Sequence, residues 1–462
     1  MKENSFYSVI GKFLVTIILF CIVQLAWSQA TNTKSVSSSQ VNHPDWSLNA
    51  NIYEVNIRQY TPEGTFAAFE KSLPRLKKMG VDILWLMPIN PIGIKNRKGT
   101  LGSYYSVKDY LGVNPEFGTL DDLKKLVKHA HDLGMHVIID WVANHTSWDN
   151  NLIKNHPEWY THDSTGKIIA PVPDWTDVAD LDYSQKGLWK YMTDALIYWV
   201  KEADIDGYRC DVAGMIPVEF WNSAVPGIKK VKNVFMLAEW ETPEMHTIAF
   251  DMTYSWDLFH LMNDIAKGTK TAGDIDSMLV KEKRDYPADA YRMRFTTNHD
   301  ENSWNGTEFE RMGEAAKTFA VLCYTLPGMP LIYSGQESAF NRRLKFFDKD
   351  TIDWNDYRLA GFYATLNKLK SGNSVLCNGS AGGKMMKVNT NNDKHIFAFL
   401  RIKDKNTMFV IINLSNISQK ITLKGKSYSG DFLDLFTNEK SHFQEGEIMT
   451  MKPWEYKVYY DK

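Results

Sequence analysis

From Ile52 onward, short β-rich runs alternate with stretches of helical spacing, and this alternation restricts the possible fold more than any other feature. Apolar residues recur every three or four positions in the helical stretches. Strand alternating with helix gives right-handed crossovers and a parallel sheet. The expected strands are Ile52–Ile57, Val81–Met87, His136–Asp140, Tyr208–Asp211, Val234–Glu239, Phe250–Thr253, Arg292–Thr297 and Pro330–Tyr333, and clear helical stretches are Phe66–Met79, Leu120–Leu133, Leu188–Glu202 and Glu314–Thr325.

This pattern predicts an α/β fold, a (β/α)8 TIM barrel. A doubly wound open sheet is the alternative, but no Gly-rich phosphate turn follows the first strand. Residues 144–180, after the third strand, show no helical period, which predicts an inserted domain. Beyond Lys370 the apolar residues alternate with a period of two, as in His395–Arg401, which predicts a C-terminal antiparallel β-sandwich domain.

The first residues resemble a secretory signal peptide. Lys2 and Lys12 precede an apolar run, Phe13–Trp27, and the small residues Ala26 and Ser28 mark a cleavage site. The run is short for a membrane span, so we expect a secreted or periplasmic protein with no stable span after cleavage; a retained anchor is the alternative. The expected organisation is signal peptide 1–28, leader 29–46, barrel 47–143 and 181–375, inserted domain 144–180 and C-terminal domain 376–462.

Composition restricts the partners. The net charge of −2 gives no reason to expect nucleic acid or an anionic membrane. The three cysteines left after signal cleavage, Cys210, Cys323 and Cys377, are widely spaced and form neither a disulfide framework nor a metal motif. The 15 Trp, 22 Tyr and 23 Phe will mostly be core, but such a surplus also fits a cleft whose aromatic rings stack on sugars.

Three acidic residues, Asp211, Glu239 and Asp300, close three of the expected strands. A carboxylate at the end of a buried strand is costly unless it has a purpose, and parallel strands point their ends at one spot. Strand parity places Arg209 on the same side as Asp211, which would keep that carboxylate ionised, whereas desolvation would keep Glu239 protonated. Two such carboxyl groups are the minimal machinery for breaking a glycosidic bond. Buried salt bridges or helix caps are the structural alternative.

These residues fall within motifs that resemble glycoside hydrolase family 13, the α-amylase family, of α-amylase or neopullulanase type. The motifs are Asp140–His145, Gly207–Asp211, Leu237–Glu239 and Asn298–Asp300, joined by Tyr105–Asp109 and Gly328–Glu337. The resemblance extends from about Trp46 to the C-terminus. It implies a barrel whose inserted region is the family's domain B, followed by a C-terminal β domain.

The resemblance also implies roles for individual residues. Asp211 corresponds to the nucleophile, Glu239 to the general acid/base and Asp300 to the transition-state stabiliser. Substrate-binding positions implied in the same way are Tyr105, Asp109, His145, Arg209, Asn298 and His299. Among these, Tyr105 would stack under the sugar that is cleaved, and Arg209 would orient Asp211.

Calcium is left open by the resemblance. Asn144 and Asp180 align with two calcium ligands of the family, but Met215 occupies the place of a third, usually a His. Oxygen donors suit calcium. The alternative is that Asn144 only hydrogen-bonds the inserted domain to the barrel. No organic cofactor is expected.

The activity implied is that of a retaining α-glucan hydrolase that cleaves α-1,4 bonds of starch, glycogen or maltodextrins. Asp211-Val212-Ala213 also resembles the neopullulanase and cyclomaltodextrinase branch, and a Val after the nucleophile is common in members acting on α-1,6 bonds. A transglycosylase and a non-catalytic glucan-binding protein are further alternatives. A metal-dependent barrel hydrolase would need paired histidines at a strand end, whereas His129 and His131 fall on an expected helix. The sequence sets neither the chain length acted on nor the oligomeric state.

Overall fold

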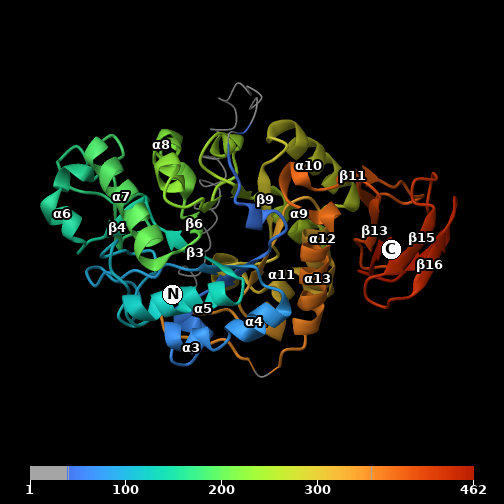
Figure 1. The fold of residues 1–462 in the computed structure, drawn as a ribbon, viewed down its shortest axis with the longest axis horizontal. Coiled ribbons are helices and arrows are strands. Elements are labelled where there is room, and N and C mark those ends of the chain that lie inside the picture. Colours follow the sequence, from blue (N-terminus) through green and yellow to red (C-terminus); the bar gives the residue numbers. More distant parts are fainter. Residues whose placement is uncertain (1–38, 40, 355, 462) are drawn as a thin grey trace, which may run out of the picture.

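The computed structural model describes residue 39, residues 41–354 and residues 356–461, so the predicted signal peptide lies outside the described part. Its centre is a closed parallel barrel in the strand order β1-β10-β9-β8-β7-β6-β3-β2 (Figure 1). The TIM-barrel prediction is therefore confirmed, and the open sheet is excluded. The barrel strands are β1 (Ile52–Val55), β2 (Ile83–Leu86), β3 (His136–Trp141), β6 (Gly207–Cys210), β7 (Phe235–Ala238), β8 (Met252–Tyr254), β9 (Tyr291–Arg294) and β10 (Met329–Tyr333).

Helices surround the barrel (Figure 1). The predicted helix Phe66–Met79 is wrong in one respect, because the chain forms two helices, α3 and α4, with Pro74 in the first turn of the second. Proline is tolerated in a first turn but not inside one continuous helix. The helices are α2 (Ile57–Tyr60), α3 (Phe66–Glu70), α4 (Leu73–Met79), α5 (Leu120–Asp132), α7 (Lys186–Ala203), α8 (Val218–Lys229), α9 (Trp256–Ala266), α10 (Ala272–Asp285), α11 (Glu308–Met312), α12 (Ala316–Thr325) and α13 (Ala360–Gly372).

Alternate residues of the barrel strands belong to two separate cores. Ile138, Leu237 and Met293 belong to the core that fills the barrel, while Cys210 and its counterparts pack outward with the helices. Side chains of a strand alternate between its two faces, so Arg209 and Asp211 share the inward face. This parity, read from the sequence, is what brings charged groups together at one end of the barrel.

The inserted region after β3 contains little regular structure. β4 (His145–Ser147) and β5 (Val178–Asp180) form an antiparallel pair, with the short helix α6 (Asn151–Asn155) between them in the sequence. This region lies at one end of the molecule in Figure 1, opposite the C-terminal domain.

The C-terminal region contains two antiparallel sheets that share one core. Phe409 and Ile411 of the larger sheet pack with Ile421 and Met451 of the smaller one, as predicted for a β-sandwich. The larger sheet has the order β11 (Lys384–Lys387), β12 (Ile396–Lys403), β13 (Asn406–Asn413), β18 (Tyr456–Tyr460), β15 (Gly430–Asp434) and β16 (Lys440–Phe443); the smaller pairs β14 (Gln419–Thr422) with β17 (Ile448–Met451).

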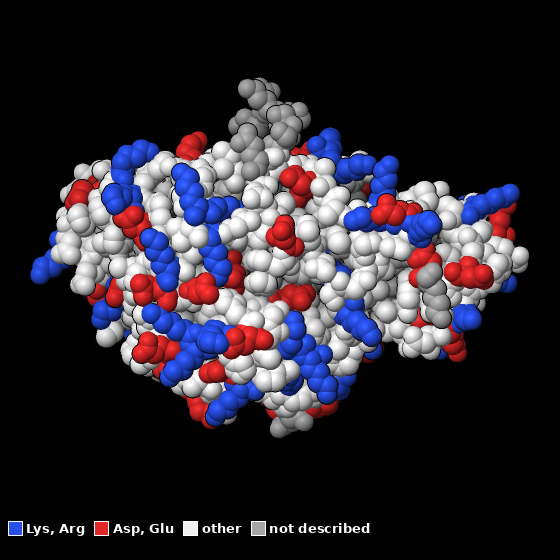
Figure 2. Space-filling view, viewed as in Figure 1, with Lys and Arg blue, Asp and Glu red and all other residues white. Residues whose placement is uncertain are grey.

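The surface shows no single sign of charge. Figure 2 shows Lys and Arg interspersed with Asp and Glu over the face viewed, consistent with the net charge of −2. Within the described residues, no helix is long and apolar enough to cross a membrane.

Candidate active site

Two of the three predicted acids stand directly at strand ends. Asp211 follows β6 and Glu239 follows β7, and their backbone N–H groups continue the ladders by donating to Trp141 O and Cys210 O, each at 3.0 Å. The two neighbouring strands therefore present both carboxyl groups at the same end of the barrel.

Asp300 reaches the same end by a different route. The prediction that it closes a strand was wrong, because β9 ends at Arg294 and a loop intervenes. Polar side chains in this loop favour local hydrogen bonds over a strand ladder. Asn298 Oδ1 accepts from Glu301 N at 2.8 Å, and Asp300 then starts a π-helical turn, Glu301–Asn305. π-turns of this kind are frequent at functional sites.

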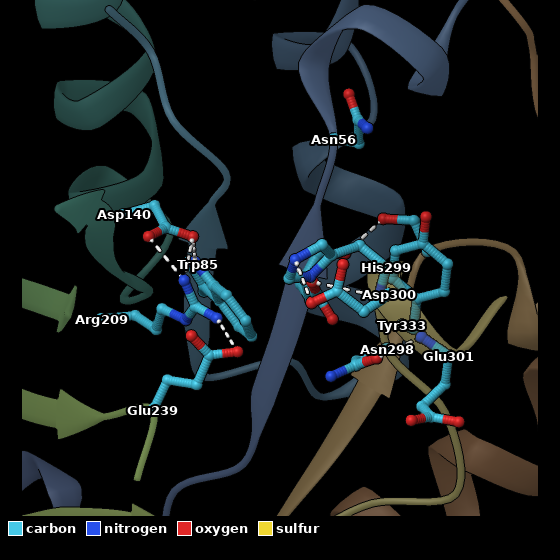
Figure 3. A network of polar contacts seen from close by, with 12 residues as sticks. Asn56, Trp85, Asp140, Arg209, Glu239, Asn298, His299, Asp300, Glu301 and Tyr333 are labelled. Atoms are coloured by element: carbon cyan, nitrogen blue, oxygen red, sulfur yellow. Dashed lines mark hydrogen bonds and ion pairs between the residues drawn. The ribbon is translucent and has the colours of Figure 1, made fainter. Parts of the chain in front are cut away.

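One guanidinium joins the carboxyl groups. Arg209 Nη1 lies 2.9 Å from Asp140 Oδ1 and 3.0 Å from Asp211 Oδ1, and Arg209 Nη2 lies 2.7 Å from Glu239 Oε1 (Figure 3). Glu239 Oε2 also accepts from Val212 N at 2.8 Å. Three carboxyl groups thus surround a single fixed cation.

Accessibility separates the members of this cluster. The side chains of Arg209 and Asp140 are 0% exposed, whereas those of Asp211, Glu239 and Asp300 are 10%, 14% and 38% exposed. Arg209 and Asp140 therefore form a buried floor, and the three predicted acids are the groups a ligand can reach.

The carboxyl groups hold protons more firmly than usual. Burial raises the pKa of Glu239 and that of Asp211 to about 7, and that of Asp140 to about 6, although Arg209 acts against each rise. The expectation that Arg209 holds the pKa of Asp211 low is not met, because burial outweighs Arg209, whose one positive charge is also shared with Asp140 and Glu239. Near neutral pH this cluster therefore retains a proton that it can give up or take back.

Asp300 is set up differently from the other two acids. His299 Nε2 lies 3.2 Å from Asp300 Oδ2 and 2.7 Å from Tyr105 Oη, and His299 Nδ1 lies 2.5 Å from Glu54 Oε1. Burial lowers the pKa of His299, but the carboxylates of Asp300 and Glu54 outweigh burial and raise it well above its ordinary value. Burial in turn raises the pKa of Asp300, but His299 overrides it and keeps that pKa below its ordinary value. Asp300 is therefore an anion at neutral pH.

Sequence reasoning missed the supporting residues Glu54, Trp85 and Tyr254, the last of which accepts from Arg209 Nε at 3.3 Å, and it named Asp140 only as part of a motif, without a role. Asp140 accepts hydrogen bonds from Trp85 Nε1 and Tyr105 Oη, each at 3.2 Å, in addition to its ion pair with Arg209. Asp140 had a readable signal, because it lies near the end of the apolar run of β3 in the same way that Asp211 follows β6. The partners of Glu54 come from segments too distant in sequence to be read from pattern alone.

The other predicted positions divide into two groups. Tyr105 and His299 lie in the cluster, Asn298 is buried beside it (Figure 3), and His145 is buried with its pKa lowered to about 4 by burial. Asp109 is exposed; its Oδ1 accepts from Leu111 N at 2.9 Å, and it lines a polar cavity of about 270 Å³ with residues of α6 and α7. The contacts place Asp109 outside the cluster around Arg209.

The two predicted calcium positions are close to each other. β4 pairs with β5 so that His145 faces Asp180, and Leu181 N donates to Asn144 O at 3.1 Å. Both side chains offer the oxygen donors that calcium takes, but calcium needs six or more oxygens. Among the described residues, no group of three or more His, Cys, Asp or Glu side chains is gathered to hold a metal ion. Calcium binding stays a prediction.

A closed (β/α)8 barrel with accessible carboxyl groups at the ends of its strands is the architecture of a barrel enzyme of the glycosidase type. Comparison with known families agrees. Residues 37–171 and 173–360 match the family described as alpha amylase, catalytic domain, and residues 396–456 match the alpha-amylase SusG C-terminal domain. The chain belongs to the alpha-amylase family.

Solved structures of this family are similar over almost their whole length. An alpha-amylase from Lactobacillus plantarum is 34% identical with a TM-score of 0.81, covering 90% of this chain and 99% of that one. A noncanonic maltogenic alpha-amylase, AmyB from Thermotoga neapolitana, is 31% identical with a TM-score of 0.81, covering 89% and 98%. Alpha-amylase MalA from Haloarcula japonica is 26% identical over 418 residues; the match takes in 86% of this chain but only 59% of that longer protein.

Proposed function

We propose that this protein is an exported, retaining α-glucan hydrolase that cleaves α-1,4 bonds in starch, glycogen or maltodextrins. Asp211 is the nucleophile, Glu239 the general acid/base and Asp300 the group that stabilises positive charge at the anomeric carbon. The predicted signal peptide supports export, and the similarity to amylases and to a maltogenic amylase supports the substrate class.

The observation that carries the proposal is the cluster around Arg209. Two partly exposed carboxyl groups, Asp211 and Glu239, are held on different nitrogens of one guanidinium, at 3.0 and 2.7 Å. A buried ion pair needs one carboxylate to balance one cation, so a third carboxyl group in the pocket is unfavourable for stability alone. For glycoside hydrolysis, an adjacent nucleophile and acid are both required.

The first chemical step breaks the glycosidic bond. Asp211 attacks the anomeric carbon while Glu239 transfers its proton to the departing oxygen, so that the leaving chain departs as an alcohol. Arg209 neutralises Asp140 and orients both carboxyl groups. The pKa of Glu239, about 7, lets it carry that proton at neutral pH.

The second step reverses the proton transfer. Glu239, now ionised, removes a proton from water, and the resulting hydroxide displaces Asp211 from the anomeric carbon. Asp300 remains an anion beside this carbon in both steps, because the neighbouring protonated His299 keeps the pKa of Asp300 below its ordinary value. Tyr105 and His299, joined at 2.7 Å, form one wall for the sugar, and His145, Asn298 and Arg209 complete the contacts inferred from the family.

Product analysis tests this proposal. Purified enzyme is incubated with amylose, pullulan, isomaltose and maltoheptaose, and products are followed by chromatography and by NMR of the newly formed anomer. We expect short α-anomeric products from amylose and maltoheptaose, and none from isomaltose. Products longer than maltoheptaose would instead establish a transglycosylase, and cleavage of isomaltose would assign α-1,6 activity.

Export has its own test. N-terminal sequencing of the protein recovered from the culture medium or periplasm should begin near Gln29. A full-length protein that fractionates with membranes would contradict the secreted form.

A further inference from the structure

Glu54 is a fully buried acid that faces the inside of the barrel. In β1 it pairs with Trp85 of β2, which belongs to the core that fills the barrel, whereas its neighbours Tyr53 and Val55 pack outward with the helices. The Glu54 side chain is 0% exposed. A substrate therefore cannot touch Glu54, and any part that it takes in the reaction must act through another residue.

The residue through which Glu54 can act is His299. His299 Nδ1 lies 2.5 Å from Glu54 Oε1, and the His299 backbone N–H donates to the same oxygen at 3.4 Å. On the other edge of the ring, His299 Nε2 lies 2.7 Å from Tyr105 Oη and 3.2 Å from Asp300 Oδ2. One edge of the imidazole thus contacts Glu54, and the other contacts groups that the proposed mechanism places at the sugar.

The charges around this pair favour a protonated ring. The titratable groups that face the pair come from elements all around the barrel, and they are Tyr105, Asp140, Arg209, Tyr254, Asp300 and Tyr333. The phenols are uncharged at neutral pH, because burial raises their pKa values well above the ordinary one. The two carboxylates in contact with His299 outweigh the effect of burial on its pKa.

The pair is poorly arranged for stability alone. Glu54 Oε2 is buried and has no hydrogen-bond partner among the described residues of the protein. Burial of a charged group is costly unless the group is fully hydrogen-bonded, and a buried ion pair is by itself weak evidence for stability. The effect of Glu54 on His299 and Asp300 is therefore the more informative property of this acid.

The same arrangement occurs twice in the site. Arg209 contacts the buried Asp140, and His299 contacts the buried Glu54; both of these acids are 0% exposed. Each cation also contacts a more exposed acid, which is Asp300 in the case of His299. Figure 3 shows Arg209 with Asp140 on one side of the site and His299 with Asp300 on the other. Each cation is thus held from inside the barrel by an acid that a substrate cannot reach.

We propose that Glu54 is a positioning residue that holds His299 as an imidazolium and aims its Nε2–H at Tyr105 and Asp300. This inference rests on the proposed function, in which Asp300 stabilises positive charge at the anomeric carbon. An imidazolium carries an N–H on both edges, so it donates to Glu54 and to the groups on the opposite edge at the same time. A neutral His299 would no longer keep Asp300 ionised.

The variant Glu54→Gln removes the charge and keeps the shape of the side chain. His299 should then lose its proton at a lower pH, so the loss of activity should grow as pH rises. We expect kcat on maltoheptaose to be about thirtyfold below wild type at pH 8 and within about threefold of it at pH 5, with KM little changed. The ratio of variant to wild type cancels titrations that both enzymes share, such as those of Asp211 and Glu239.

Proton NMR observes the pair directly. The proton between His299 Nδ1 and Glu54 should resonate far downfield of the backbone amides in the wild type up to pH 8, and this signal should be absent from Glu54→Gln at pH 8. His299→Gln removes the ring and so identifies the signal. Glu54→Asp keeps the charge, so any loss of kcat in this variant should not vary between pH 5 and pH 8.

Glu337→Gln is the matched control. Glu337 is also 0% exposed and is paired with one cation, Arg75, at 3.0 Å, but its hydrogen-bond partner Tyr53 packs with the outer helices. This variant should leave kcat at both pH values, and the downfield signal, unchanged.

The outcomes for the two proposals differ. A wild-type His299 that loses its proton at an ordinary pKa overturns the role of Glu54, and this result needs no Glu54 variant to fold. A loss of kcat in Glu54→Gln that is equal at pH 5 and pH 8 overturns it as well. A wild-type enzyme that cleaves no α-glucan would instead contradict the proposed function, while the NMR experiment would still decide whether Glu54 holds the proton on His299.

Discussion

One strand of the barrel carries a buried acid at each end, and the two acids have opposite surroundings. Asp206 precedes β6 and Asp211 follows it. Asp206 is surrounded by bases, with His131 Nε2 at 2.7 Å and Lys232 Nζ at 2.8 Å, and it accepts from Val137 N at 2.7 Å. Asp211 instead shares its one cation, Arg209, with two other carboxyl groups.

The proton affinities of the two acids follow from these surroundings. Burial acts to raise the pKa of Asp206, but His131, His136 and Lys232 together lower it well below its ordinary value. Burial raises the pKa of Asp211 to about 7, and Asp140 adds to the rise. The charges at the end of the barrel that holds Asp206 therefore stabilise the fold. The acids at the end that holds Asp211 are unfavourable for stability and are useful only for catalysis.

The largest difference expected between the two acids is in kcat. Asp211→Asn should lower kcat on maltoheptaose about a thousandfold or more, because an amide cannot form the covalent bond to the anomeric carbon. Asp206→Asn makes the same chemical change at the other end of β6 and should keep kcat within about threefold of wild type at 25 °C. Initial rates of the two purified variants check both values.

Equal losses in the two variants would show that the first reflects misfolding. Circular dichroism spectra that match wild type are the control. An active Asp211→Asn enzyme would remove Asp211 from the nucleophile position.

For stability, the site around Asp206 should matter more than the site around Asp211. Asp206→Asn removes the buried carboxylate that Lys232, His131 and His136 share and leaves Lys232 and His131 only the exposed Asp204, so we expect the free energy of unfolding at pH 7 to fall by about 3 kcal/mol. Because the folded-state pKa of Asp206 is lowered, its contribution is present above the ordinary aspartate pKa and is lost as pH falls through the folded value. Urea unfolding at pH 7 and pH 3 should therefore show a smaller difference between wild type and variant at pH 3. A difference that stays constant would contradict the role of its charge.

The charged residues at one end of the barrel could be predicted from the sequence, and those at the other end could not. Asp211 and Glu239 were readable because each ends an apolar run whose period of two also fixes the inward face of Arg209. Asp206 begins an apolar run, and its partners come from α5, β3 and the segment after α8. No local sequence pattern therefore predicts the cluster of bases around Asp206. Charge clusters built from distant segments need the closed barrel before they can be seen.

The candidate site shows a similar division. Asp300 was found by its motif with His299, although the strand assigned to it ends at Arg294 and a polar loop follows. The division of one guanidinium among three carboxyl groups was not predicted, although the pairing of β3 with β6, which brings Asp140 to Arg209, agrees with the predicted barrel. Burial raises the pKa of Asp211, and the Asp140 carboxylate that this pairing brings close adds to the rise.

Glu239→Gln should have a smaller effect on stability, opposite in sign to that of Asp206→Asn. Burial raises the pKa of Glu239 from 4.5 to about 7, so the wild-type protein loses stability as pH rises between these values. An amide removes this loss. We expect the variant to be more stable than wild type by about 2 kcal/mol at pH 8 and equal to it at pH 4. Thermal unfolding at both pH values measures this, and a variant less stable at pH 8 would show that the acid-rich end contributes to stability.

The smallest expected effect concerns calcium. If Asn144 and Asp180 contribute to a calcium site, the ion binds near the end of the barrel that holds Asp211, where three carboxyl groups share one cation. At the other end, Asp206 is already paired with His131, His136 and Lys232. Excess CaCl2 should then raise Tm by about 2 °C over EDTA, because an ion that binds only the folded state stabilises it. Asn144→Ala should abolish this increase, and Asp206→Asn, although less stable, should keep it. The same Tm in CaCl2 and EDTA would leave Asn144 with its backbone contact to Leu181 as its structural role, and the excess negative charge around Arg209 would then be balanced by retained protons alone.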